Sequence, residues 1–278
     1  RAWMQAQDVA TAQLYVEALL NMTPPDLTEA TNVLTRMGDR VSNDASLILA
    51  RAEILAKRNR MDDARRELSA SYSTVRNDPR QIMAWYAASR RILTNPSELA
   101  AYLELLEREI PDPWVTYLRG RTLSESAVTL SQGVELLRRV QAIDNVTLAV
   151  NAHRTEGSAY YALDRNEEAV EAWKRGLAKF GDDWEMNNNV AFILAKKLDR
   201  AEEAVPFAER AAKMNPNAAE IQDTLGVAYT LTKQFDKAEA ALQKAMDNSR
   251  AGSDGQVTIL VHQGMLDVAR GNMESARA

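Results

Sequence analysis

The stretch Asn217–Ser249, NAAEIQDTLGVAYTLTKQFDKAEAALQKAMDNS, contains two apolar stripes at helical spacing. The stripes consist of Ile221, Leu225, Ala228 and Tyr229, and then of Phe235, Ala238, Leu242 and Ala245. Because the polar segment 232–234 separates them, the pattern predicts two short amphipathic helices joined by a tight turn. Helices of this length are marginal in water when isolated, so the hairpin must bury its apolar faces against similar elements.

Two small residues indicate where the helices of this hairpin approach each other. Gly226 has no side chain and Ala238 has only a methyl group. A glycine inside a helix costs about 1 kcal/mol relative to alanine, so a mid-helix glycine usually has a packing reason. The order Leu225-Gly226-x-x-Tyr229 followed by Ala238-x-x-x-Leu242 resembles the signature of the tetratricopeptide repeat (TPR) family. Other residues occupy the family's Trp, Phe and Pro slots, namely Gln222, Leu242 and Arg250.

The hairpin pattern recurs along the chain at the TPR period. Three pairs of equivalent positions lie 34 residues apart, namely Ala30 and Ala64, Gly157 and Ala191, and Ala204 and Ala238. The step from Ala191 to Gly226 is 35, which predicts one extra residue in the turn near 197–199. Glu156 replaces the apolar residue that is expected before the glycine, and we expect it to weaken its helix locally.

Helix breakers and capping residues divide the rest of the chain into further pairs. Ala2–Met22 is expected to form a first helix that a Pro-Pro pair ends, and Leu27–Met37 forms its partner with Gly38 as a C-cap. From Asn77 to Asp144 the repeat pattern is weaker, and the assignment of helix pairs there rests on turns such as Asn95-Pro96. The sequence predicts a single array whose approximate units are 1–41, 42–77, 78–111, 112–146, 147–183, 184–216, 217–251 and a truncated 252–278.

The last predicted unit contains one complete helix. Gly264 takes the glycine slot, 38 residues after Gly226, and Gly271–Ala276 resembles the turn and the start of a second helix. The sequence starts at Arg1 without an initiator Met and stops at Ala278, so we expect it to be a piece of a longer protein. The last first-type helix is expected to expose an apolar face, where the next helix would have packed. Two interpretations of this face stay open, a surface for a homodimer and an artefact of the truncated end.

Composition and charge exclude several classes of function. With 46% hydrophobic and 26% charged residues, the 278-residue chain is predicted to be folded and soluble. The sequence does not identify its compartment, and the cytoplasm and the periplasm both stay open. No stretch approaches the ~20 consecutive apolar residues that a membrane span requires. The net charge of −5 argues against nucleic-acid binding, and the absence of Cys excludes disulfides and thiolate metal sites.

No catalytic, metal or cofactor site is predicted. His153 and His262 are the only histidines and lie 109 residues apart, about three repeats, so they do not form a joint site. Paired carboxylates at 62–63, 167–168 and 202–203 begin second helices, where acidic side chains interact favourably with the helix dipole. No phosphate-binding glycine loop, nucleophile elbow or metal-ligand spacing is present, so we expect no enzyme activity.

The TPR resemblance implies an all-α fold in which antiparallel helix hairpins stack into a right-handed α-α superhelix. It also implies that the first helix of each pair lines a concave groove that holds a peptide or protein segment. By the family's register, the groove-facing residues are Tyr117, Arg121, Asn151, Arg154, Ser158, Tyr161, Asn188, Phe192, Asp223 and Thr230. The alternative interpretation is that these residues are simply the solvated faces of helices.

Two ligand-binding devices of the family are not predicted here. An asparagine ladder would need Asn at the slots equivalent to Asn189, but those slots hold Thr155 and Thr224. The clamp for chaperone C-terminal carboxylates would need a cation where Asp223 lies.

Two functional classes remain open. The first is a non-catalytic scaffold that binds an unidentified protein or peptide in the groove. The second is a TPR segment of a larger enzyme, transporter or secretion component whose active domain lies outside this sequence.

Overall fold

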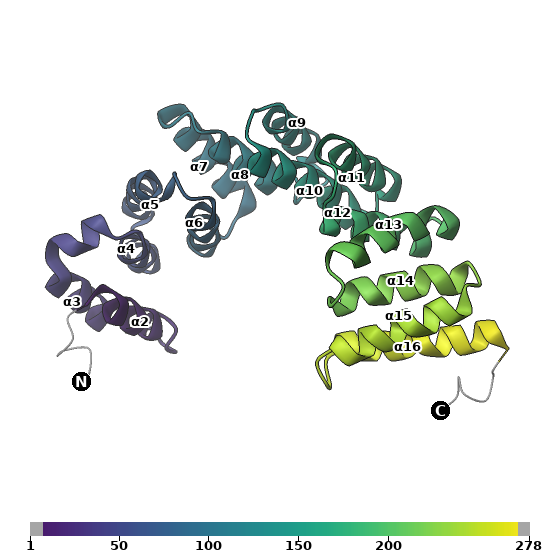
Figure 1. Cartoon of the computed structure of the whole chain (residues 1–278). Helices are drawn as coiled ribbons and strands as arrows, with labels where there is room; N and C mark the ends of the chain where they lie inside the picture. The colour runs from purple at the N-terminus through teal and green to yellow at the C-terminus, as the bar shows by residue number, and fades with distance from the viewer. Residues whose placement is uncertain (1–7, 272–278) are drawn as a thin grey trace. The chain divides into compact units, whose positions relative to one another are not determined.

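The computed structural model describes residues 8–271, and every regular element in this part of the chain is helical (Figure 1). The chain divides into two compact units, Arg1–Leu123 and Ser124–Ala278. Within each unit, successive helices pack as antiparallel pairs (Figure 1). The predicted all-α fold of stacked helix hairpins is therefore confirmed.

The helices of the N-terminal unit follow the breakers and caps of the sequence. They are α2 (Val9–Leu20), α3 (Leu27–Met37), the 3-10 helix η1 (Gly38–Asn43), α4 (Ala45–Lys57), α5 (Met61–Val75), α6 (Pro79–Ile92), α7 (Pro96–Glu109) and α8 (Pro113–Leu123). The predicted helix Ala2–Met22 corresponds to α2, although its first six residues lie outside the described part of the chain. The predicted partner Leu27–Met37 is confirmed, and Gly38 follows it as the C-cap with a φ of 56°.

The C-terminal unit contains the clearest repeats. Its helices are α9 (Leu130–Gln141), α10 (Val146–Ala162), α11 (Asn166–Phe180), α12 (Trp184–Lys196), α13 (Ala201–Met214), α14 (Ala219–Leu231), α15 (Phe235–Asn248) and α16 (Asp254–Arg270). The predicted second helix of the last unit would begin after Gly271, outside the described residues.

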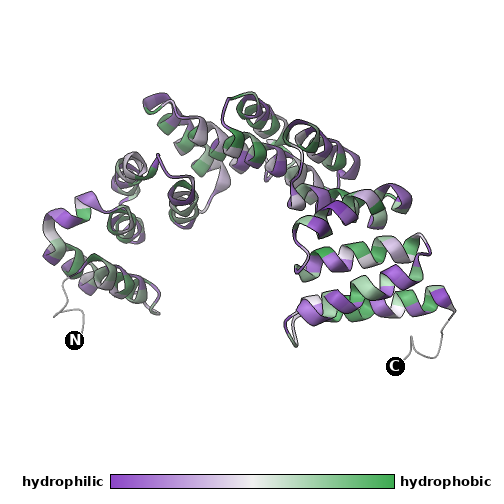
Figure 2. Ribbon diagram, in the orientation of Figure 1, coloured by the Kyte–Doolittle hydropathy of each residue, from purple (hydrophilic) through white to green (hydrophobic). Residues whose placement is uncertain are grey.

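Four hairpins pack most closely, and they correspond to four predicted units. They are α4–α5, α10–α11, α12–α13 and α14–α15. We call the first helix of each predicted pair the A helix and the second the B helix, so that α2, α6 and α16 are also A helices and α3 is a B helix. Each helix carries both hydrophobic and hydrophilic residues along its length (Figure 2), as expected for elements that bury one face.

The turn between A and B helices has the same backbone conformation in all four close hairpins. The residue two positions before the B helix has a φ between 52° and 60° in each case, and these residues are Asn59, Asp164, Asp199 and Lys233. The turn of the α12–α13 hairpin spans 197–200, whereas the equivalent turns span 163–165 and 232–234. The extra residue predicted near 197–199 is therefore confirmed.

Glycine allows close approach within two of these hairpins. A Cβ atom added to Gly157 would lie 2.3 Å from the buried indole of Trp173, and one added to Gly226 would lie 2.6 Å from the side chain of Leu242. Ala238 is fully buried in the same hairpin as Gly226. The predicted packing role of the glycine and alanine slots is confirmed at these positions.

The weaker central repeats pack differently. Trp85 on α6 lies between Tyr72 on α5 and Tyr102 on α7, with ring centroids 4.9 Å and 6.5 Å away. α6 and α7 contact each other little, and α7 packs more closely on α8. The boundary at 123/124 falls inside the predicted unit 112–146, so that the eight-unit division of the chain stays a prediction.

Among residues 8–271, no helix combines the length and the apolar composition needed to cross a bilayer.

Candidate functional site

The ten residues predicted to face a groove all lie on helices that the sequence assigned as first helices. Tyr117 and Arg121 lie on α8 of the N-terminal unit, and the other eight lie on α10, α12 and α14 of the C-terminal unit. Ser158 and Tyr161 are exposed. Those that are half-buried are Arg121, Asn151, Arg154, Asn188, Phe192 and Asp223.

Two of the predicted residues present no side chain to a ligand. Tyr117 is buried and its ring packs edge-on against Trp114, with the centroids 5.6 Å apart. Thr230 is buried, and its hydroxyl donates to the carbonyl oxygen of Gly226 at 2.9 Å. Their assignment as groove residues is therefore corrected, because family register places a residue on a helix face without fixing its depth.

Arg154 forms ion pairs that the sequence did not predict. Its Nε donates to the Asp183 carboxylate at 3.1 Å, and Nη1 lies 3.2 Å from the carboxylate of Glu185. Asp183 in turn caps α12, where its side chain accepts from the backbone N–H of Met186. The charge of Arg154 thus ties α10 to the start of α12 and is already compensated.

Two of the predicted aromatic residues do come together. The rings of Tyr161 on α10 and Phe192 on α12 are perpendicular, with centroids 6.3 Å apart. The ammonium group of Lys196 lies 5.9 Å from the Phe192 ring. This group is a partly exposed aromatic surface of a kind that suits an apolar side chain of a polypeptide.

Next to this surface lies a polar chain that the sequence did not predict. His262 on α16 is buried, with Nδ1 2.7 Å from the carboxylate of Asp223 and Nε2 2.7 Å from Nζ of Lys196. A small cavity of about 10 Å³ touches all three residues and Phe192. Because His262 lies 39 and 66 residues from its two partners, only the stacking of α12, α14 and α16 brings them together.

The three asparagines at 187–189 have distinct environments. Asn187 is buried, donates to the carbonyl oxygen of Asp183 at 2.8 Å, and accepts from Nε of Arg210 at 3.0 Å. The side-chain oxygen of Asn188 is buried and has no hydrogen-bond partner among the described residues. Asn187 therefore has a structural role, whereas Asn188 keeps an acceptor that is unsatisfied.

Glu156 has a structural role that the sequence did not predict. Its side chain is 0% exposed, and one of its oxygens accepts from Arg138 at 2.9 Å and from Arg175 at 2.7 Å. The other oxygen accepts from the amide of Gln141 at 2.7 Å. Instead of only weakening α10, the residue joins α9, α10 and α11 through a buried, fully hydrogen-bonded carboxylate.

His153 lies close to this carboxylate. Its ring is buried against Phe180, with centroids 5.8 Å apart, and Nδ1 has no partner among the described residues. Burial is the main cause that lowers its pKa, and it outweighs the carboxylate of Glu156, which acts in the opposite direction.

A groove on the A helices of the N-terminal unit is lined by residues that were not among the ten predicted from the sequence. It has a volume of about 480 Å³ and is lined by residues of α2, α4 and α6. We call it the A-helix groove. Its small residues are Ala50, Ala84, Ala87 and Ala88, and its charged residues are Glu17, Glu53 and Arg91. Alanines on successive A helices were the available signal, because short side chains leave room above the helix backbones.

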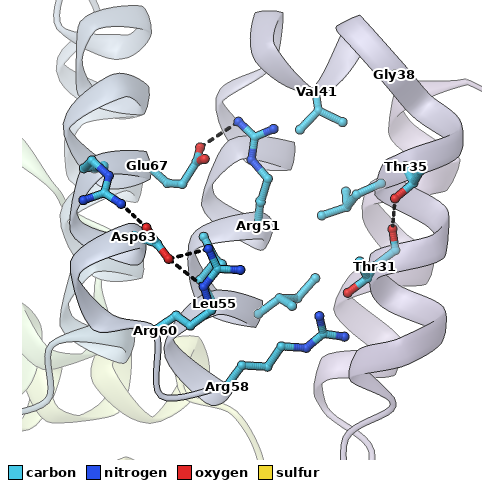
Figure 3. A pocket seen from close by; sticks show the side chains of 13 residues that line it. Thr31, Thr35, Gly38, Val41, Arg51, Leu55, Arg58, Arg60, Asp63 and Glu67 are labelled. Atoms are coloured by element: carbon cyan, nitrogen blue, oxygen red, sulfur yellow. Dashed lines mark hydrogen bonds and ion pairs between the residues drawn. The ribbon is translucent and has the colours of Figure 1, made fainter.

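A second cavity lies on the B-helix side of the same unit. It has a volume of about 430 Å³ and lies between α3 and α5, above α4 (Figure 3). Arginine side chains surround it. None of its lining residues is shared with the A-helix groove.

The predicted uncovered face of the last described helix is confirmed. Five large apolar residues of α16 are exposed, namely Val257, Leu260, Val261, Met265 and Val268. No group of three or more potential metal ligands is found among the described residues.

Comparison with known proteins agrees with the repeat and with the fold. Residues 219–251 match the sequence profile of the family described as Tetratricopeptide repeat. YrrB, described as a TPR protein with an unusual peptide-binding site, is 18% identical over 63% of this chain and 86% of its own, with a TM-score of 0.50. MamA from Desulfovibrio magneticus RS-1 is 20% identical over 70% of this chain and 89% of its own, with a TM-score of 0.42. Curated protein sequences gave no significant match.

These results establish the class of the protein. The profile matches one repeat, and the recurring hairpins extend the same pattern along the chain. Residues 219–251 are therefore a tetratricopeptide repeat, and the stacked hairpins of the chain have the fold of TPR proteins. At an identity of 18%, the similarity to YrrB is one of fold alone.

Proposed function

We propose that the chain is a non-catalytic scaffold that binds a segment of a partner polypeptide in the A-helix groove. The observation that carries the proposal is the groove itself, because three successive A helices of one compact unit enclose about 480 Å³ over an alanine floor. Ala84 and Ala87 are exposed there, so a bound side chain can approach the helix backbone. TPR proteins generally act through protein–protein contacts, which agrees with this assignment.

The polar residues of the groove indicate the kind of segment that it takes. Glu53 lies 4.0 Å from Arg91 and 3.7 Å from Lys57, whereas Glu17 makes no ion pair among the described residues. Leu49 adds an apolar surface beside the alanines. A segment that combines a small or apolar side chain with a basic one therefore complements this groove.

Filling the groove tests the proposal. Peptides selected from a displayed random library against the purified chain would be compared by fluorescence anisotropy on the parent, Ala87→Tyr and Ala101→Tyr. Ala101 is equally exposed on α7 but does not line the groove, so it is a matched control. We expect Ala87→Tyr to weaken binding about tenfold and the control to leave it unchanged. Equal affinity for all three proteins would place the binding site elsewhere.

A second candidate interaction is a homodimer through α16. The exposed apolar residues of this helix, Val257, Leu260, Val261, Met265 and Val268, follow one another at helical spacing, so they form a stripe on which two copies can pair isologously. Val261→Lys with Val268→Lys places four ammonium groups in such an interface. We expect sedimentation equilibrium to show a monomer for this variant and a dimer for the parent, and a dimer that persists in the variant would contradict the assignment.

The second functional class, a TPR segment of a larger protein whose active domain lies outside this sequence, stays a prediction.

A further inference from the structure

The cavity between α3 and α5 has an apolar floor and a basic rim (Figure 3). Leu34 of α3, Val41 of η1, and Ile54 and Leu55 of α4 supply apolar surface. The charged residues around the cavity are Arg51, Arg58, Arg60, Arg66, Asp63 and Glu67. The cavity thus combines a surface for an apolar group with groups that recognise an anion.

The charges around this cavity do not balance. Asp63 is shared, because Arg60 donates to it at 2.6 Å and Arg66 also pairs with it. Glu67 pairs with Arg51 at 2.7 Å. Arg58 donates to a neutral acceptor, the carbonyl oxygen of Leu27, at 3.0 Å. Four guanidinium groups therefore face two carboxylates, which leaves the cavity with an excess of positive charge.

The arginines around the cavity also have too few hydrogen-bond acceptors. Nε of Arg51 is buried and has no partner among the described residues, although buried polar groups are normally satisfied. Arg51 lies on α4, Arg58 caps the end of α4, and Arg66 lies on α5. Guanidinium groups are planar donors that match the geometry of a carboxylate and form charge-assisted hydrogen bonds with it.

We propose that this cavity binds an acidic side chain of a partner polypeptide together with an adjacent apolar side chain. The apolar floor favours a polypeptide with alternating acidic and apolar residues. The chain's net charge of −5 makes a long polyanion such as nucleic acid an unfavourable occupant. The site lies apart from the A-helix groove and has the opposite charge preference, so it goes beyond the proposed function.

Two labelled peptides test this proposal by fluorescence anisotropy. One has the sequence Gly-Leu-Glu-Leu-Glu-Leu-Gly, and in the other each Glu is replaced by Gln. We expect the Glu peptide to bind about tenfold more tightly than the Gln peptide, and the difference to shrink at high salt. Equal binding of the two peptides, or no binding of the Glu peptide, would overturn the proposal.

Variants of the residues that line the cavity show whether the Glu peptide binds there. Arg58→Gln with Arg66→Gln removes two exposed guanidinium groups, and Arg80→Gln is the control because Arg80 is exposed in the same unit and does not line the cavity. Thr35→Trp fills the cavity from an exposed position of α3 without changing its charge. We expect the double variant and Thr35→Trp each to weaken binding of the Glu peptide about tenfold, with Arg80→Gln unchanged. An equal loss in Arg80→Gln would show non-specific attraction and overturn the site.

Discussion

Gly157 lies against the indole of Trp173, and the fit between the two sets how closely α10 and α11 pack. Trp173 is buried and donates through Nε1 to the carbonyl oxygen of Arg154 at 3.2 Å, so its ring has little freedom to move. The same slot in the α14–α15 hairpin pairs Gly226 with the more flexible Leu242. A glycine that weakens an isolated helix therefore stabilises the hairpin as a whole.

We expect Gly157→Ala to lower the free energy of unfolding by about 1–3 kcal/mol, because overpacking against Trp173 outweighs the better helix propensity of alanine. Gly255→Ala is the control, since an added Cβ there meets only Ser253 Oγ at 3.7 Å. Urea denaturation followed by circular dichroism measures both. A Gly157→Ala protein as stable as the parent would show that Trp173 can move aside.

His153 makes the stability of the C-terminal unit depend on pH. Because burial lowers its pKa in the folded chain, the unfolded chain binds protons more strongly. The free energy of unfolding therefore falls as the pH drops through the ordinary histidine pKa of about 6.5, and the loss levels off below the folded pKa. Urea titrations at about pH 7.5 and about pH 5.5 should show a smaller difference for His153→Phe than for the parent. An unchanged difference would mean that other groups cause the pH dependence.

The A helices α14 and α16 are equivalent elements of two repeats, and their equivalent positions lie 38 residues apart. Their surroundings differ. Val227 on α14 is 3% exposed, whereas Met265, its equivalent on α16, is 41% exposed. The helices that follow α14 in the array, α15 and α16, pack against it. The same helical pattern therefore gives a core face in one repeat and an open face in another.

Serine substitutions should distinguish these two faces. Val227→Ser removes buried apolar surface and is expected to cost about 1–3 kcal/mol of unfolding free energy. Met265→Ser, on the exposed face, is expected to change it by less than about 0.5 kcal/mol. Thermal and urea melts at low protein concentration keep self-association out of the comparison. A large loss for Met265→Ser would show that another part of the chain covers α16.

Over the whole chain, two units each bury their own hydrophobic core, and different surfaces of these units carry the proposed binding sites. The sequence predicted the clear repeats well, down to the extra turn residue between α12 and α13, because local period and turn length determine those features. The sparse contact between α6 and α7 was not predicted, because local period does not determine how closely two helices pack.

Site residues were harder to predict than helices. Register placed Phe192 and Tyr161 on one surface, but it did not reveal that Tyr117 is buried or that Arg154 is paired with Asp183. Ion pairs between residues about 30 positions apart form only when repeats stack. The A-helix groove escaped detection because its alanines are also ordinary helix formers.

The most direct test of the proposed function is hydrogen exchange of the chain with and without a library-selected peptide, read by mass spectrometry. We expect slower exchange in the three helices that line the A-helix groove, Val9–Leu20, Ala45–Lys57 and Pro79–Ile92. Exchange in α7 and α15 should not change. Protection that leaves α2, α4 and α6 unaffected would contradict the assignment of the groove as the polypeptide-binding site.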